Sequence, residues 1–250
     1  MADLPFGIDF GGTGIKGAPV DLGTGDFAAE RERIKTPQPS TPEAVAEVFV
    51  ELLAKFPDST GPVGVTVPAV VRHGVVRSAA NIDDAWVDTD ADALFTKATG
   101  RDVHVVNDAD AAGLAEVRYG AAKGRRGLVV VTTLGTGIGS ALVYDGVLVP
   151  NSELGHLEID GHDAESRAAN SARERDDLSW KHWAKRLTKY YATVEKLFSP
   201  DLIVVGGGVS KHAEEFLPLI DVETEIVPAQ LLNKAGVVGA ALVASEALAP

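Results

Sequence analysis

The sequence contains no cysteine among its 250 residues, so disulfide bonds and thiolate metal sites are excluded. Any bound metal must therefore be held by oxygen or histidine ligands. The chain also lacks an apolar run of the roughly 18 residues that cross a membrane, and its N-terminus lacks the charged and apolar regions of a secretory signal. We therefore expect a cytoplasmic protein that does not bind a membrane.

Positive charge is scarce as well. The 23 Lys and Arg residues against 36 Asp and Glu residues give a formal net charge of −13, which argues against general nucleic-acid binding because such binding needs a basic face. The segment 166–200 is an exception, since it holds eight basic and four acidic residues, a local 8 − 4 = +4. This basic segment is either a solvated helix face or a track for a polyanion. The track would consist of Arg167, Arg173, Arg175, Lys181, Lys185 and Lys189.

Short apolar strands alternate with segments of helical period, a pattern typical of α/β proteins. The pattern leaves residues 72–88 and 151–170 as irregular segments. It predicts strands at 6–10, 15–20, 27–34, 63–67, 103–106, 128–134, 138–144, 147–149, 202–205 and 222–227. It predicts helices at 42–56, 91–99, from 108 onward, and at 178–198, 210–217 and 235–249.

An internal repeat indicates two similar halves. Gly12-Thr13-Gly14-Ile15 and Gly135-Thr136-Gly137-Ile138 stand at an offset of 123 residues, and each lies in a strand, glycine turn, strand, tight turn, strand pattern. We therefore predict two α/β domains. The smaller N-terminal domain spans residues 1–108 and is completed by a C-terminal helix at 236–250, and the larger domain spans residues 109–235.

Both glycine turns are candidate phosphate sites. Main-chain N–H groups in such turns bind phosphate oxygens when no Cβ stands in the way, although each turn taken singly could be a plain hairpin. Neither the P-loop motif nor a complete dinucleotide fingerprint occurs. Lys16 adds a cation and Asp9 a possible Mg²⁺ anchor through water. The phosphate-binding candidates are Asp9, Gly11, Gly12, Thr13, Gly14, Lys16, Gly135, Thr136 and Gly137.

Asp108 stands where a buried strand ends and a helical pattern begins. An acidic residue at this point is commonly only the helix N-cap. It can also face the crevice outside the carboxyl end of a strand, where open α/β sheets bind ligands. The two glycine turns and the polar residues on either side favour a catalytic role.

These segments together resemble the family of sugar kinases, repressors and related open-reading-frame proteins, the ROK family. D-F-G-G-T-G-I-K resembles its first phosphate motif, N-D-A-D-A-A its catalytic motif and L-G-T-G-I-G its second phosphate motif. E-L-G-H resembles its sugar motif, and V-V-G-G-G-V-S, with Gly207 and Gly208, the motif over the nucleotide base. The resemblance implies a two-lobed, actin-like (ribonuclease H-like, hexokinase/Hsp70 superfamily) ATPase fold with an inter-lobe cleft.

Longer segments such as E-L-G-H-L-E-I-D-G-H-D-A-E are similar to the actinobacterial polyphosphate glucokinase and glucomannokinase group of that family. The resemblance implies transfer of the terminal phosphoryl group of inorganic polyphosphate to the 6-hydroxyl of glucose, with Mg²⁺ as cofactor and ATP as a weaker or absent donor. Asp108 would be the general base. Asn81, Asn107, Glu153, His156 and Glu165 would bind the sugar, and Trp86 could wall its pocket.

The chain departs from the family at two points. The cysteine-rich zinc motif that most members carry after the sugar-site histidine is replaced by Gly161-His162-Asp163-Ala164-Glu165, so we expect no zinc and a loop ordered by packing alone. Pro68-Ala69 also stands where relatives commonly have Pro-Gly, and the added methyl group could narrow sugar specificity.

Two alternatives remain. One is an ATP-dependent kinase for mannose, an N-acetylated amino sugar or another hexose. The other is a sugar-responsive repressor, but the first strand starts within six residues, which leaves no room for a winged helix-turn-helix. The family resemblance also implies a homodimer.

Overall fold

The computed structural model describes residues 3–79 and 82–247 of the chain. Residue contacts divide it into two units, of which the first contains the chain up to Ala115 and from Lys234 onward and the second contains Glu116–Asn233. The chain enters the second unit within helix α3 (Asp108–Tyr119). The domain limits expected after residues 108 and 235 stay a prediction. The sugar-site candidate Asn81 lies outside the described residues.

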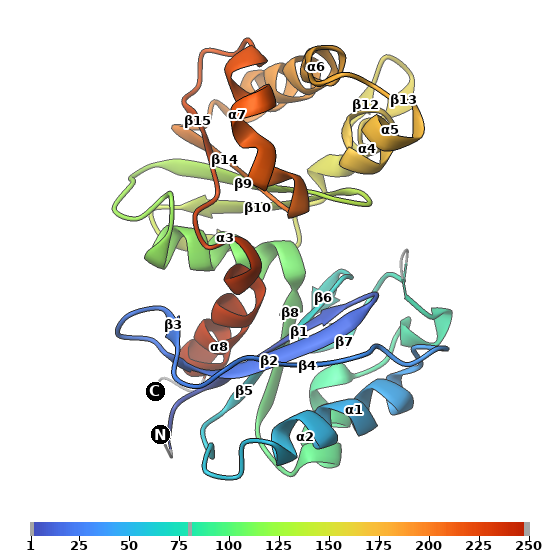
Figure 1. The fold of residues 1–250 in the computed structure, drawn as a ribbon, viewed down its shortest axis with the longest axis vertical. Coiled ribbons are helices and arrows are strands. Elements are labelled where there is room, and N and C mark those ends of the chain that lie inside the picture. The colour runs from blue at the N-terminus through green and yellow to red at the C-terminus, as the bar shows by residue number, and fades with distance from the viewer. Residues whose placement is uncertain (1–2, 80–81, 248–250) are drawn as a thin grey trace. The chain divides into compact units, whose positions relative to one another are not determined.

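The first unit contains a mixed sheet with the order β3-β2-β1-β5-β8, in which β4 also pairs with β2 (Figure 1). Strand β1 is antiparallel to β2 and parallel to β5, and β5 is parallel to β8. The strands are β1 (Phe6–Gly11), β2 (Gly14–Asp21), β3 (Asp26–Phe27), β4 (Glu32–Ile34), β5 (Val63–Val67) and β8 (Val103–Asn107), beside a two-stranded pair of β6 (Val71–Arg72) and β7 (Val75–Val76).

Helices cover both faces of this sheet. Helices α1 (Pro42–Ala54) and α2 (Ala91–Thr99) pack together on one face, and α8 (Ala235–Ala247) lies along β1 and β5 on the other. Helix α1 begins as its sequence predicts, because Thr41 accepts a hydrogen bond from the Ala44 amide at 3.3 Å and Pro42 stands in the first turn. Buried side chains of strands β1 and β5 and of helices α1 and α2 form the core on the face of the sheet that α1 covers.

The packing of α8 is unusually close. A Cβ at Gly7 of β1 would lie 2.7 Å from the carbonyl carbon of Val237, and one at Gly64 of β5 would lie 3.1 Å from Cα of Ala240. The helix therefore lies directly on the strand backbones. Since side chains alternate along a strand, Asp9 and Thr66, two residues further on, face the same side as these glycines.

The second unit contains a sheet with the order β11-β10-β9-β14-β15. Its directions match the first sheet: β9 is antiparallel to β10 and parallel to β14, β10 is antiparallel to β11, and β14 is parallel to β15. The internal repeat predicted from the glycine turns is therefore confirmed. The strands are β9 (Leu128–Leu134), β10 (Ile138–Tyr144), β11 (Val147–Val149), β14 (Leu202–Gly206) and β15 (Ile226–Pro228), with a separate hairpin of β12 (Glu158–Ile159) and β13 (His162–Asp163).

The longest helix of the second unit, α6 (Trp180–Phe198), places Trp183, Leu187 and Tyr191 in a core with Val130 and Ile203 of the sheet. The opposite face of the sheet carries a smaller cluster of buried aliphatic residues. The helices are α4 (Glu165–Ala168), α5 (Asn170–Arg175), α6 (Trp180–Phe198) and α7 (Ala213–Phe216), and the chain's 3₁₀ turns are η1 (Asp84–Trp86), η2 (Leu154–His156), η3 (Gly208–His212), η4 (Leu217–Leu219) and η5 (Leu232–Lys234).

Three predicted elements differ in the structure. The strand expected at 27–34 is divided into β3 and β4, because Val20 pairs with Phe27 but Ile15 pairs with Ile34, which leaves extra residues between them. The helix expected at 210–217 is broken into η3, α7 and η4, and Pro218 prevents its continuation. The strand expected at 222–227 begins only at residue 226, because the amide of Thr224 donates to a side chain of α6.

The segments 72–88 and 151–170 are more regular than expected, since the first contains β7 and η1 and the second contains η2, β12, β13 and α4. The suggestion that Trp86 walls a sugar pocket was wrong. Trp86 is fully buried in the core of the first unit, where it packs on Phe10 and Phe95 and donates a hydrogen bond to the carbonyl of Ser40 at 2.8 Å. Over the described part of the chain, none of the helices has both the length and the apolar character of a membrane span.

Candidate active site

The first glycine turn joins β1 to β2, with Gly11 paired to Gly14. Thr36 holds it from the side, because its hydroxyl donates to the carbonyl of Gly11 at 2.6 Å and the side chain is buried. A Cβ at Gly12 would meet no atom within 4 Å. The turn is therefore supported from one side and open at Gly12, as a phosphate-binding turn requires.

Asp9 is held beside this turn by its neighbours on the sheet. One carboxylate oxygen lies 3.1 Å from Nζ of Lys16, and the other accepts a hydrogen bond from the hydroxyl of Thr66 at 3.2 Å. A Cβ at Gly236, in the first turn of α8, would lie 3.1 Å from the Asp9 carboxyl group. Asp9 remains 23% exposed, and an oriented carboxylate is a ligand type that Mg²⁺ accepts directly or through water.

At the junction of β8 and α3, the residue before Asp108 caps the helix. The side-chain oxygen of Asn107 accepts from the amides of Ala109 at 2.9 Å and Asp110 at 3.1 Å, so Asn107 caps α3. Its amide nitrogen donates to the carbonyl of Ala69 at 3.0 Å, which, among the residues that the structure describes, leaves one N–H of this buried side chain for a ligand. Asp108 stands in the first turn, half-buried, and also accepts from Ala109 at 2.8 Å.

The second glycine turn joins β9 to β10 in the second unit. The amide of Gly135 donates to the carbonyl of Gly137 at 3.0 Å, and Ser171 of α5 binds the carbonyls of Gly135 and Thr136 at 3.0 and 2.5 Å. A Cβ at Gly135 would meet no atom within 4 Å. This turn is thus also supported from one side and open at one glycine.

Glu165 connects this turn to the predicted sugar residues. Its carboxylate accepts from the amide of Ile138 at 2.9 Å and occupies the space that a side chain at Gly137 would take, since a Cβ there would lie 3.1 Å from the Glu165 carboxyl carbon. The second unit therefore places a sugar-site candidate directly against a phosphate-site candidate.

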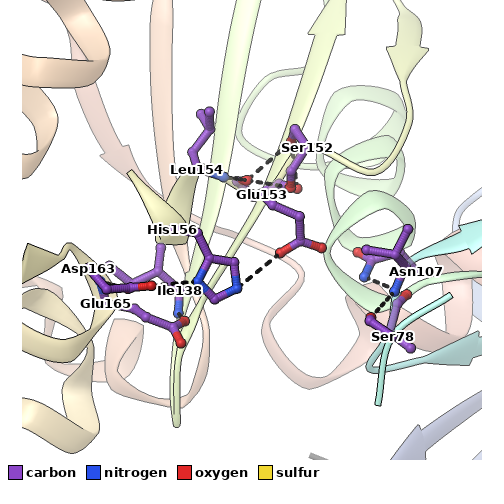
Figure 2. Close-up of polar contacts among 12 residues, drawn as sticks. Ser78, Asn107, Ile138, Ser152, Glu153, Leu154, His156, Asp163 and Glu165 are labelled. Carbon is purple, nitrogen blue, oxygen red and sulfur yellow. Dashed lines mark hydrogen bonds and ion pairs between the residues drawn. The ribbon is translucent and has the colours of Figure 1, made fainter. Parts of the chain in front are cut away.

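Glu153, His156 and Glu165 lie together, as Figure 2 shows. Nε2 of His156 lies 3.9 Å from the Glu153 carboxylate, and Nδ1 hydrogen-bonds Asp163 at 2.8 Å. Ser140 holds the preceding chain, because its hydroxyl donates to the Ser152 carbonyl at 2.7 Å and accepts from the amide of Leu154 at 2.9 Å.

The electrostatics of this group follow from these contacts. The hydrogen bond to Asp163 raises the pKa of His156, and the nearby carboxylates of Glu165 and Glu153 act in the same direction. Burial raises the pKa of Glu153, an effect that His156 partly opposes. Potential ligand atoms of His156, Asp163 and Glu165 lie within 4.8 Å of one another, but His156 and Asp163 already hydrogen-bond to each other.

Asp163 was missed in the sequence, although it lies in the segment that replaces the zinc motif. The expectation that packing alone orders this loop was wrong. Besides the His156–Asp163 hydrogen bond, the β12–β13 hairpin and a hydrogen bond from the Ala164 amide to the Leu157 carbonyl at 2.9 Å hold it.

The third glycine segment follows β14 and lies beside the second turn. Gly207 has a φ of +85°, and a Cβ there would lie 2.6 Å from the amide nitrogen of Leu134, the residue before Gly135. At Gly208 the corresponding space is open. The two glycine segments of the second unit are therefore neighbours.

The six predicted track residues differ in their surroundings. Arg167, Lys185 and Lys189 line a cavity of about 280 Å³ together with Arg186 and Tyr190, and Lys189 forms an ion pair with Asp160. Arg173, Arg175 and Lys181 do not line it. Arg173 stacks on Trp180 at 4.2 Å, Arg175 binds Asp176 at 2.8 Å and Lys181 is exposed.

Comparison with known proteins gives a consistent result. The profile of the ROK family matches residues 5–172. The polyphosphate glucokinase of Mycobacterium tuberculosis (strain CDC 1551 / Oshkosh) is 51% identical over 238 residues, which cover 95% of this chain and 89% of that protein.

Solved structures agree. The inorganic polyphosphate/ATP-glucomannokinase of Arthrobacter sp. strain KM is 56% identical with a TM-score of 0.93, covering 98% of this chain and 99% of that one. A ROK family glucokinase of Streptomyces griseus, solved with glucose and AMPPNP, is 25% identical with a TM-score of 0.83, covering 97% and 99%. The actin-like hexokinase fold predicted from the sequence is confirmed.

Proposed function

The chain belongs to the ROK family, and from this premise we propose that it is a polyphosphate glucokinase, which transfers the terminal phosphoryl group of inorganic polyphosphate to the 6-hydroxyl of glucose. The observation that carries the proposal is the 56% identity, over nearly the whole chain, to a kinase named for polyphosphate, ATP, glucose and mannose. The same similarity favours a second candidate function, ATP-dependent phosphorylation of mannose, which a sugar and donor panel separates.

In this reaction Asp108 is the general base. As the sugar oxygen bonds to the terminal phosphorus, its proton passes to the Asp108 carboxylate, and the bond from that phosphorus to the next bridging oxygen breaks. The products are glucose 6-phosphate and a polyphosphate one unit shorter. Support comes from the capping of α3 by Asn107, because its side chain accepts from the amides of Ala109 and Asp110 without Asp108.

Sugar hydroxyls both donate and accept hydrogen bonds, so a pocket of carboxylates, amides and an imidazole suits them. We assign this role to Glu153, His156 and the remaining N–H of Asn107, with Asn81 from the sequence motif. We assign two roles to Glu165: it supports the second glycine turn and, because it lies beside His156, it contributes to the sugar pocket. A site of this type rejects analogues that lack a hydroxyl.

The glycine turns, with Gly207 and Gly208, and Lys16 bind the phosphates of the donor. Phosphoryl transfer requires mainly positioning and charge neutralisation from the protein. Asp9 would hold Mg²⁺ through water, and the ion supplies part of that neutralisation when bound. Asp9 fits this role because its carboxylate is oriented by Lys16 and Thr66 and stays partly exposed.

For the distal part of a long donor we propose the cationic cavity of the second unit. Arg167, Lys185 and Lys189 line it, whereas Arg173, Arg175 and Lys181 remain track residues by prediction only. Replacing Lys185 by Gln is expected to raise KM for long polyphosphate without changing KM for ATP. If the variant has the same KM for long polyphosphate as the parent, this assignment is contradicted.

The direct test measures initial rates of glucose 6-phosphate formation with polyphosphate and with ATP, side by side. Turnover with ATP only would contradict the polyphosphate proposal.

Asp108→Asn is expected to lower kcat by roughly 10²–10⁴-fold while glucose binding is retained, which titration calorimetry measures. A variant with a near-normal rate would remove the base assignment. We also propose a homodimer, on the family resemblance alone, for which light scattering is expected to give twice the chain mass. We propose a cytoplasmic location from the sequence, in which neither a membrane span nor a secretory signal was found.

A further inference from the structure

Arg33 brings a second cation to the first glycine turn, and no role has been assigned to it so far. It lies on β4 opposite Lys16 of β2, and Lys16 lies opposite Asp9 of β1, which lies opposite Thr66 of β5. Residues directly opposite each other on neighbouring strands point to the same face. The four side chains therefore form one row across the sheet.

The two cations of this row differ in their surroundings. Lys16 is paired with Asp9 at 3.1 Å. Within the described residues Arg33 has no carboxylate partner, and its guanidinium donates a hydrogen bond to the carbonyl of Thr13 in the turn at 3.1 Å. A guanidinium has five N–H groups, so several remain for an anion.

The space above the turn shows how Arg33 is placed. A Cβ at Gly14 would lie 2.7 Å from Nη2 and 2.8 Å from Cζ of Arg33, so the guanidinium occupies the position of the missing side chain. Gly14 has no positive φ, and the glycine is therefore required here for space. The position above Gly12 is open, and it lies beside the residue that Arg33 contacts.

We propose that Arg33 binds the anionic oxygens of a condensed phosphate at the first glycine turn and contributes more to inorganic polyphosphate than to a nucleotide donor. This inference rests on the proposed function for the identity of the donor. Inorganic polyphosphate has no base or ribose, so charged contacts provide most of its binding, whereas ATP retains contacts through its nucleoside. A planar guanidinium binds phosphate oxygens in a bidentate way, which a lysine does not.

The test compares Arg33→Gln with a matched control, Arg31→Gln. Both remove one positive charge from the same segment, but Arg31 lies two residues earlier, with its guanidinium 5.9 Å from the centre of the Phe27 ring. We expect Arg33→Gln to weaken binding of tripolyphosphate, measured by titration calorimetry without glucose, roughly 10- to 100-fold. Arg31→Gln is expected to change it less than about threefold. Equal effects of the two substitutions would overturn the proposal.

Kinetics test the donor preference. The kcat/KM for polyphosphate is expected to fall more in Arg33→Gln than the kcat/KM for ATP, and equal losses would overturn this part of the inference. If the parent protein binds tripolyphosphate through Arg33 but transfers no phosphoryl group from it, the proposed function fails and the binding site stands.

A second variant tests the geometry. A methyl group in Gly14→Ala would displace the guanidinium, so this substitution should weaken tripolyphosphate binding strongly in the parent and much less in an Arg33→Gln background. Additive effects in this double-mutant cycle would show that Gly14 acts independently of Arg33 and would overturn the proposed geometry.

Discussion

Substitution of Gly7 by Ala tests how closely the last helix lies on the first sheet. The added Cβ would lie 2.7 Å from the carbonyl carbon of Val237, and an ordinary carbon–carbon contact is about 3.5 Å. Helix α8 would therefore have to move by at least about 0.8 Å, because the carbonyl oxygen of Val237 would lie closer still to the added Cβ. No rotamer change relieves this contact because both partners are main chain. Overpacking of a core costs about 1–3 kcal/mol, and for a backbone contact we expect the upper end, about 3 kcal/mol.

Unfolding by urea is monitored by circular dichroism, and Gly208→Ala serves as the matched control. A Cβ at Gly208 would meet no atom within 4 Å, and its φ is not positive, so the control is expected to change the free energy of unfolding by less than about 0.5 kcal/mol. Gly7→Ala should also lower kcat/KM, because α8 begins against Asp9. If Gly7→Ala unfolds at the same urea concentration as the control, the close packing of α8 is refuted.

Three further predictions concern the second unit. Asp163→Asn removes the hydrogen bond that raises the pKa of His156, so this pKa, followed by NMR titration of the imidazole, should fall; an unchanged value would contradict the assignment. Because folding raises the pKa of His156, protonated His156 stabilises the folded protein. This contribution to the free energy of unfolding is fully present below the ordinary histidine pKa and is lost as the pH rises through the higher pKa of the folded state. Glu116→Ala leaves three main-chain amides without their acceptor and should cost about 3 kcal/mol in urea unfolding, whereas a loss below about 1 kcal/mol would show that water replaces the carboxylate. Gly137→Ala should displace the Glu165 carboxylate and lower kcat by up to about 100-fold, and a parental rate would separate Glu165 from catalysis.

Local signals predicted most of the fold. Thr41 and Pro42 mark the start of α1, and Gly100 ends α2 with a φ of +69°, as their chemistry requires. The glycine turns could be located because each is flanked by apolar strands. Their equivalence followed from a constant offset, and the strand order of the two sheets agrees with it.

The contacts that complete the site were not predictable, because they join residues distant in sequence. Thr36 lies 25 residues from Gly11, and Arg33 lies 20 residues from Thr13. A single threonine just after a strand, or a single arginine within a short strand, has no local pattern that distinguishes it from a surface residue. The prediction that Trp86 walls a sugar pocket failed for the same reason. Its proximity to Asn81 in the sequence does not indicate that its side chain is buried in the core.

The loop around His156 shows how a chain without cysteine can order a histidine that we propose to bind the sugar. A metal fixes an imidazole by binding one ring nitrogen, and a carboxylate achieves the same by accepting the N–H at that nitrogen. Here Asp163 binds Nδ1, so Nε2 is left facing Glu153. The carboxylate also adds negative charge, which a metal would not, and so raises the pKa of the imidazole. Asp163 thus fixes the orientation of His156 and, by raising its pKa, extends to higher pH the range over which the imidazole holds a second proton.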